Sequence, residues 1–370
     1  MKKYSKISVL SLLIALNICV LGNNKNTILG NIKNKTENKA LAGAVVFLSQ
    51  TCYSAVSDNE GNYKIENIIP GNYQVVICAK GYIPAMSSMY IDKDNTYPLN
   101  VSLEPLTSAD LIKYNSPKNS DFESDYLIFE RIFIGQTAFM GSCKVENPEA
   151  MNFNWNKGVI EGKSNGFVIF IHKKFGYKIR CLINDFIYDT KQLFRRLDYS
   201  IYFEELKPED KDELEDWQNY RKEAYEGSIN HFMWAFRNDK MNEEEYAVFA
   251  LRSLGPEAMM SDGMDSASDA NNQFQNKIFT FSEVSLGDID QNLKMFTING
   301  FLKVVHKPRS YSKETSFLQV PGQTVMMIDK HGWVDIEQPY NSYGKWSKNG
   351  ISNMLPKDYR AKYIDKEIKE

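Results

Sequence analysis

Residues 57–73 read SDNEGNYKIENIIPGNY, and this stretch decides the fold of the N-terminal part of the chain. Asp58 and Gly61 are typical of a tight turn, because Asp accepts backbone hydrogen bonds and Gly tolerates a positive φ. Pro70 and Gly71 mark a second turn. The segment between these two turns, 63–65, favours a short strand.

The same pattern of turns and short β-prone segments continues on both sides of this stretch. Short β-prone segments alternate with turns and are spaced at the intervals expected of an antiparallel sandwich. The sequence predicts strands at 27–32, 43–48, 54–57, 63–65, 73–80 and 99–103.

The order of these elements resembles the carboxypeptidase regulatory-like domain family. The resemblance rests on Ile28-Leu29-Gly30-Asn31-Ile32, Leu41-Ala42-Gly43-Ala44-Val45-Val46, Ser57-Asp58-Asn59-Glu60-Gly61-Asn62-Tyr63, Pro70-Gly71-Asn72-Tyr73 and Gly81-Tyr82. It implies a seven-stranded Ig-like, transthyretin-like sandwich over residues 24–105. In this family the domain is usually an accessory or interaction module, so the resemblance implies a fold and no reaction.

The composition indicates a folded, mostly β protein. The chain has 370 residues, 43% hydrophobic residues and a net charge of −3, which fits two domains and argues against disorder. The 21 Tyr and 21 Phe favour β structure. A slightly acidic chain is not expected to bind nucleic acid.

Residues 1–22 have the pattern of a secretory signal peptide. Lys2, Lys3 and Lys6 precede an apolar run at 7–21, and small residues precede a cleavage point before Asn23. Two alternatives are an uncleaved anchor and a lipid on Cys19. We expect export to the periplasm, outer membrane or cell surface of a bacterium. No later window is long enough for a transmembrane helix.

The second region is predicted to be β-rich and to contain one helical segment. A polar linker is expected at 106–124, followed by a domain at 125–370. Its strands are predicted at 125–134, 137–145, 167–172, 177–184, 199–206, 246–252, 278–281, 293–306 and 324–329. A long polar loop at 255–276 is expected to be mobile or functional.

Helical spacing covers residues 209–237. The segment begins after Pro208 with acidic residues, which favour a helix start. Gly227-Ser228 interrupts the pattern, and Ser228 is suited to cap a second helix.

The second region also looks like the C-terminal region of a family of bacterial envelope proteins that carry a carboxypeptidase regulatory-like domain at the front. Its matching residues are Gly135, Cys143-Lys144-Val145-Glu146-Asn147-Pro148, Phe175-Gly176-Tyr177, Tyr220-Arg221, Ala224-Tyr225-Glu226-Gly227-Ser228, His231-Phe232 and Leu355-Pro356-Lys357-Asp358-Tyr359. This resemblance implies architecture and export, with no catalytic residues to carry over.

Arg221, Tyr225 and His231 are the candidate binding residues. Arg221 and Tyr225 lie four positions apart and can share a helix face. Ser228, three positions before His231, adds the alternative of a hydrolase with a serine nucleophile and a histidine base. These helix neighbours are more simply a cap and a hydrogen-bonded histidine. A protein or small-ligand binder without catalysis is therefore the first hypothesis.

A third hypothesis is a carbohydrate-binding accessory protein. Aromatic residues separated by Gly, Pro and Asn can form stacking platforms. The residues concerned are Trp333, Tyr340, Tyr343 and Trp346. Core or edge packing would explain the same pattern.

No metal or cofactor is expected. Zinc carboxypeptidases use a His-x-x-Glu pair, but the third residues after the histidines are Phe175, Trp234, Arg309 and Val334. Asp58 and Glu60 suit a turn better than calcium.

The four cysteines that would follow the signal peptide leave two alternatives open. They are either buried thiols or disulfides, most simply Cys52–Cys78 and Cys143–Cys181.

Overall fold

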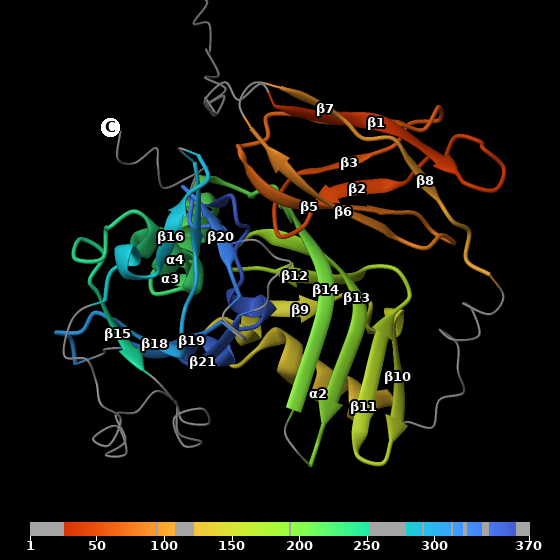
Figure 1. The fold of residues 1–370 in the computed structure, drawn as a ribbon. Helices are drawn as coiled ribbons and strands as arrows, with labels where there is room; N and C mark the ends of the chain where they lie inside the picture. The colour runs from red at the N-terminus through yellow and green to blue at the C-terminus, as the bar shows by residue number, and fades with distance from the viewer. Residues whose placement is uncertain are drawn as a thin grey trace, which may run out of the picture.

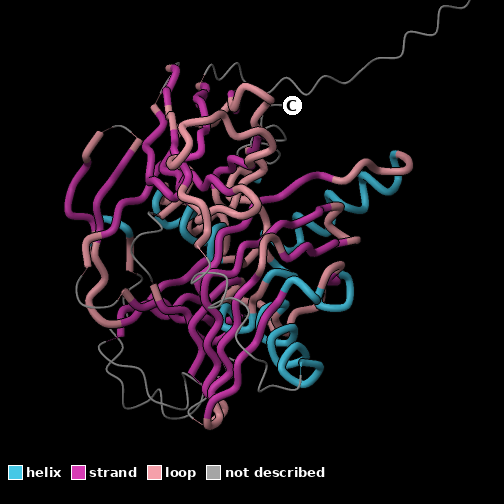
Figure 2. The backbone as a smooth tube through the Cα atoms, turned by 90° about the vertical axis from the view of Figure 1, so that its right-hand side faces the viewer, coloured by secondary structure: helices cyan, strands magenta, loops and turns pink. Residues whose placement is uncertain are grey.

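The computed structural model describes residues 26–92, 95–107, 122–191, 194–251, 279–290, 292–311, 314–320, 324–334 and 340–359. The chain is mostly β, as the composition predicts. An N-terminal sandwich packs on a larger β-rich part, and the long strands β13 and β14 run away from the sandwich through that part (Figure 1). Figure 2 gives the view turned by 90° and shows how strands dominate the described chain. The predicted signal peptide and the loop at 255–276 lie outside the described residues.

The sandwich consists of two four-stranded sheets. One contains β1 (Thr27–Asn34), β4 (Asn62–Ile65), β7 (Thr96–Pro98) and β8 (Val101–Leu103). The other contains β2 (Val45–Leu48), β3 (Ser54–Val56), β5 (Gly71–Cys78) and β6 (Ala85–Ile91). Strands β6 and β7 are absent from the sequence prediction.

Strands β7 and β8 occupy one strand position, because both run parallel to β1 and pair with successive parts of it. The chain between β7 and β8 comes so close to β1 at Leu99 that the facing residue of β1 has to be a glycine. A Cβ atom on Gly30 would lie 1.9 Å from the Leu99 carbonyl oxygen. Counted by position, the sandwich therefore has the seven strands that the resemblance implied.

The turn at Asp58 forms as predicted. Its Oδ1 accepts hydrogen bonds from the backbone N–H groups of Glu60 (3.1 Å) and Asn62 (2.7 Å). Gly61 has a φ of 80°. These bonds use Asp58 to hold the turn.

A six-stranded sheet and helix α2 (Phe122–Ile134) begin the second part. The sheet contains β9 (Cys143–Val145), β10 (Met151–Asn156), β11 (Val159–Ser164), β12 (Val168–His172), β13 (Tyr177–Asp189) and β14 (Phe194–Glu205). Helix α2 packs on it through Phe129 and Phe133, which contact rings of the sheet.

The prediction of a strand at 125–134 is wrong, because this segment is helix α2. Its buried residues Asp125, Phe129 and Phe133 are four positions apart, which is a helical spacing. The helix also begins inside the predicted linker, whose residues 108–121 are not described. Two smaller differences are a 3₁₀ turn at Phe281–Glu283 and a division of the predicted strand 293–306 into two.

Two further sheets and two helices complete the second part. The sheets are β15 (Tyr246–Leu251), β18 (Phe301–His306), β19 (Glu314–Gln319) and β21 (Asn341–Gly344), and β16 (Ser285–Asp288), β17 (Leu293–Phe296) and β20 (Met326–Asp329). The helices are α3 (Lys211–Tyr225) and α4 (Ile229–Arg237), which confirms the helical segment predicted at 209–237.

The α3–α4 junction lies between two hydrophobic cores. Ala224 and Tyr225, at the end of α3, belong to the core of the six-stranded sheet. Phe232 and Phe236 of α4 belong to the core of the C-terminal sheets. The junction is thus held from both sides.

The sandwich is joined to the second part by backbone hydrogen bonds. Gln50 donates its N–H to the Ile201 carbonyl (2.6 Å) and accepts from the Lys357 N–H (2.7 Å). Phe203 donates to the Thr51 carbonyl (2.9 Å). The rings of Phe47 and Tyr202 are in contact across the same boundary, with their centroids 4.7 Å apart and their planes tilted by 32°. The sandwich is therefore docked on the second part.

Trp333 extends this interface into the sandwich. Its side chain is 3% exposed, packs within the sandwich core and lies 5.7 Å from the Tyr73 ring. The turn that presents it is fixed by Asp329, whose Oδ1 accepts from the N–H groups of His331 and Trp333. Gly332 has a φ of 81° and no room for a side chain beside Trp234.

Asp329 makes the stability of this interface sensitive to pH. Burial raises the pKa of its carboxyl from 3.8 to about 6, although the turn N–H groups and Lys357 oppose the shift. A raised carboxyl pKa means that the folded protein binds the proton more tightly than the unfolded chain does. Stability therefore falls as pH rises from about 4 to about 6 and remains lower above that range.

Asp329→Asn should raise the melting temperature above pH 6, where the charged carboxylate is the less stable form. A shift of this size corresponds to at most about 3 kcal/mol, and the gain should shrink as pH falls to 4. Thermal unfolding between pH 4 and 8 measures it, with the exposed Asp92→Asn as the control. A gain independent of pH, or a loss at pH 8, would contradict this assignment.

The four described cysteines are free thiols, so the disulfide alternative is wrong for this structure. Cys143 and Cys181 pair with His172 and Val168, on opposite sides of β12. That is four residues of strand, roughly 13 Å, which is beyond disulfide reach. Cys78 lies opposite Val45 at the start of β2, whereas Cys52 lies beyond the other end of β2.

Candidate functional site

The α3–α4 junction has the local geometry that the sequence predicts. Ser228 caps α4, and its Oγ accepts a hydrogen bond from the His231 N–H at 3.1 Å. Gly227 has a φ of 75°, and a Cβ atom there would lie 2.7 Å from Nδ1 of His306. Trp346 donates its Nε1–H to the Gly227 carbonyl at 2.9 Å. The junction is therefore tightly fixed.

The His231 ring is engaged on both nitrogens. Its Nδ1 accepts from the Gly227 N–H (3.1 Å) and lies 3.0 Å from the Tyr246 hydroxyl. Its Nε2 lies 2.9 Å from Oε2 of Glu244. This pattern assigns the proton to Nε2 in the neutral ring. Both ring nitrogens are engaged by groups other than Ser228 Oγ, so the alternative of a Ser228 nucleophile with His231 as its base is not assembled.

Arg221 is a structural residue. Its side chain is 2% exposed, and its Nε donates to the Phe175 carbonyl at 2.7 Å. The guanidinium lies 4.0 Å from the Tyr177 ring centroid and 3.2 Å from Glu205 Oε1. These contacts attach α3 to the sheet.

Tyr225, a member of the predicted set, lines a cavity of about 280 Å³. It belongs to the core, and its ring lies 4.9 Å from His231 and 5.7 Å from Tyr359. Arg221 and His231 do not line that cavity. The structure therefore brings Tyr225 and His231 together and places Tyr225 at this cavity, while a binding site shared by Arg221, Tyr225 and His231 stays a prediction.

Two adjoining cavities surround the α3–α4 junction. One, of about 280 Å³, is lined by Tyr199, Tyr225 and Tyr340, and we call it the tyrosine cavity. The other, of about 420 Å³, has three lysines and three glutamates in its lining, and we call it the charged cavity. Four residues contribute to the lining of both cavities, namely Ala224, Ser228, Asn349 and Asn353. We call the two cavities together the cleft, and the four residues that line both of them its waist.

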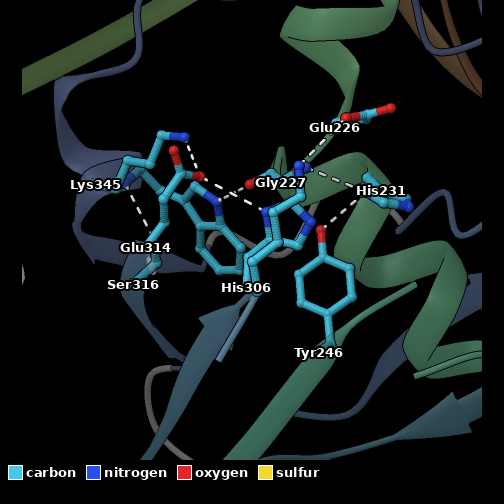
Figure 3. A network of polar contacts seen from close by, with 10 residues as sticks. Glu226, Gly227, His231, Tyr246, His306, Glu314, Ser316 and Lys345 are labelled. Carbon is cyan, nitrogen blue, oxygen red and sulfur yellow. Dashed lines mark hydrogen bonds and ion pairs between the residues drawn. The ribbon is translucent and has the colours of Figure 1, made fainter. Parts of the chain in front are cut away.

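Charged side chains pair with one another along the wall of the charged cavity (Figure 3). Glu314 forms an ion pair with Lys345 and lies 3.7 Å from Nδ1 of His306. Burial acts to raise the pKa of Glu314, but hydrogen bonds from His306 and Lys345 lower it overall. Lys307 and Glu226 form another pair at 3.6 Å. The cavity therefore presents polar groups that are already largely neutralised.

Side-chain amides line the waist and the tyrosine cavity. Asn349 and Asn353 lie at the waist and Asn230 lines the tyrosine cavity. All three are half-buried, and within the described residues none of these amides has a protein hydrogen-bond partner. Half-buried amides of this kind can donate to and accept from a ligand.

The tyrosine cavity contains residues from both parts of the chain. Gln50 comes from the sandwich and Tyr199 from β14. Burial raises the pKa of Tyr199 and Tyr340 well above neutrality, so both hydroxyls keep their protons. Arg195 is held by a hydrogen bond from its Nη2 to the Ser347 carbonyl at 2.7 Å. Docking of the sandwich thus completes this cavity.

The aromatic residues proposed as a carbohydrate platform do not share a surface. Trp333 and Trp346 are 3% and 5% exposed and pack in two different cores. Tyr343 donates to Gln319 at 3.2 Å on β19. Of these four aromatic residues, Tyr340 is the one that lines the tyrosine cavity. The platform of four aromatic residues is therefore wrong.

The described residues contain no group of His, Cys, Asp and Glu side chains suited to a metal ion. The buried His172 illustrates a structural histidine. Burial lowers its pKa to about 4, and its ring nitrogens bind the Phe175 N–H and the Ser352 carbonyl.

No helix among those described combines the length and apolarity needed to cross a membrane.

Sequence reasoning missed the polar residues that line the cleft. Arg195, His306, Glu314, Lys345, Asn349 and Asn353 come from separate segments and form no local motif. Two residues singled out in the sequence lie at the cleft: Ser228, identified as a cap, and Tyr225, a predicted binding residue.

Residues 28–110 match the family model of the CarboxypepD_reg-like domain. The N-terminal sandwich is therefore a CarboxypepD_reg-like domain, as its turns and strand order implied. No curated protein matches the chain.

Solved structures show a local likeness. A cohesin–X-dockerin complex from Acetivibrio cellulolyticus is 24% identical over 20% of this chain and 51% of the other, with a TM-score of 0.18. The minor pilin of Streptococcus agalactiae is 18% identical over 23% and 45%, with a TM-score of 0.19. A DUF3823 family protein from Bacteroides ovatus is 10% identical over 50% and 82%, with a TM-score of 0.18. The chain spans about half the length of the first of these.

Proposed function

We propose that this chain is an exported, non-catalytic binding protein whose small-molecule ligand occupies the cleft around the α3–α4 junction. The CarboxypepD_reg-like domain serves as a wall of the binding site in addition to any docking role. The N-terminal pattern of basic residues, apolar run and small residues supports export to the cell envelope.

The waist of the cleft carries this proposal. Asn349 and Asn353 line both cavities, and their half-buried amides have no hydrogen-bond partner within the part of the chain that the structure describes. Ligand sites are commonly concave, lie at domain boundaries and contain a few such polar groups. Ser228 Oγ serves as a helix cap and the His231 ring faces other partners, which supports binding over hydrolysis.

Blocking the waist should abolish ligand binding. Asn353→Phe places a ring between the cavities, whereas Asn242→Phe adds the same ring at an exposed position that lines neither cavity. Melting temperatures should be measured with a panel of saccharides, dipeptides and organic acids. At least one compound should raise the value by a few degrees for the parent and Asn242→Phe, but not for Asn353→Phe.

Two results would overturn the proposal. One is that no compound distinguishes Asn353→Phe from the parent. The other is hydrolysis of a p-nitrophenyl ester panel that is lost in a folded Ser228→Ala, His231→Ala variant.

A further inference from the structure

We propose that the ligand is an organic carboxylate whose acidic group binds in the tyrosine cavity beside Arg195. This inference rests on the proposed function and names the chemical class of ligand for the same cleft.

Among the described residues that line the tyrosine cavity, the charged side chains are Arg195 and Lys357, both cationic. Lys357 also faces the domain interface, where its Nζ lies 5.8 Å from the Trp333 ring centroid and near Asp329. Arg195 is exposed, and no Asp or Glu among the described residues forms an ion pair with it. Arg195 is thus the charge that a ligand can use.

Neutral donors accompany this charge. The hydroxyls of Tyr199 and Tyr340 keep their protons, and the amides of Asn230 and Asn349 add N–H groups. A carboxylate accepts several hydrogen bonds and pairs well with a planar guanidinium. The apolar lining, which includes Leu355, suits the body of the molecule.

The charged cavity fixes the direction of the ligand. Its described lining includes three glutamates and three lysines, so it has no excess of Lys charge to attract a carboxylate. Its lysines already pair with acids, as Lys345 does with Glu314 and Lys307 with Glu226. The acidic end of the ligand therefore lies in the tyrosine cavity and its uncharged end lies toward the charged cavity.

The chain offers a matched control for Arg195. Arg196 follows it on β14, so its side chain points to the opposite face of the sheet. Arg196 forms an ion pair with Asp185 on β13 and does not line the cavity. Arg195→Gln and Arg196→Gln remove the same charge from adjacent positions.

Two kinds of molecule supply such a carboxylate, a uronic-acid saccharide and a peptide C-terminus. Titration calorimetry on the full mature chain should compare glucuronic acid with glucose, and the dipeptide Leu-Tyr with its C-terminal amide. One acid should bind at least about tenfold more tightly than its neutral partner, because a charge-assisted hydrogen bond is lost in the partner. The acid that binds identifies the source.

Arg195→Gln should weaken that acid by about tenfold or more, and Arg196→Gln by less than about twofold. Added salt should weaken binding to the parent, since Arg195 is exposed. Equal binding of acid and neutral partner, an unaffected Arg195→Gln, or no binding of either acid would each overturn the carboxylate proposal. If a neutral compound binds and Asn353→Phe abolishes it, the proposed function stands while the carboxylate class fails.

Discussion

Replacing Trp333 with alanine is expected to destabilise the protein by about 3–5 kcal/mol, which is the range for a buried aromatic residue. Trp333 is 3% exposed and sits in the sandwich core although it follows β20 of the second part. Its ring contacts Tyr73 and fills the space beside Gly71, where a Cβ atom would be 2.8 Å away. Its removal should loosen the whole interface.

Urea unfolding measures the stability change, and Trp155→Ala is the control. Trp155 is 38% exposed on β10, so its loss should cost less than about 2 kcal/mol. Hydrogen exchange should rise for residues of the sandwich in Trp333→Ala and remain unchanged in Trp155→Ala. Equal effects of the two substitutions would contradict the docking of Trp333 in the sandwich.

Arg221→Ala is the second substitution with a large expected effect, and it should lower the free energy of unfolding by about 2–4 kcal/mol. The substitution leaves the buried Phe175 carbonyl without its 2.7 Å partner and removes the cation stacked on Tyr177. The pair with Glu205 contributes little, because the Glu205 side chain is 42% exposed. Stability should fall while the affinity for the ligand of the cleft stays the same.

Arg180→Ala is the comparison for Arg221→Ala. Arg180 is 28% exposed and bonds Glu204 at 2.6 Å, so its removal should cost about 1 kcal/mol or less. Guanidinium denaturation gives the stabilities and calorimetry gives the affinities. If the Arg221→Ala protein kept its stability but lost ligand binding, Arg221 would instead be a residue of the ligand site.

Local sequence patterns predicted those elements whose chemistry is local. Asp58 and Gly61 specify their turn, and Ser228 specifies its cap, through neighbours within four residues. The prediction of a strand at 125–134 was wrong because the apolar residues of this segment fit both the period of a strand and the period of a helix. Tyr126, Ile128, Ile132 and Ile134 alternate as in a strand, while Phe129 and Phe133 share a helix face.

The cleft and the domain interface could not be predicted because their contacts are distant in sequence. Gln50 meets Lys357, Tyr73 meets Trp333, and Gly227 meets Trp346, each through tertiary packing. Arg221 and His231 have residue types common in sites, but burial and backbone bonds assign them to structure. Side-chain identity alone does not distinguish these roles.

Hydrogen exchange at two amides tests most directly the claim that the sandwich and the second part form one ligand-binding unit. The Gln50 N–H bonds Ile201, and the Lys357 N–H bonds Gln50, at the edge of the tyrosine cavity. Both amides should exchange as slowly as those of β5 and β13, and Trp333→Ala should accelerate both. Rapid exchange of both amides in the parent protein would contradict the claim, because the sandwich would then be undocked and the cleft would lose a wall.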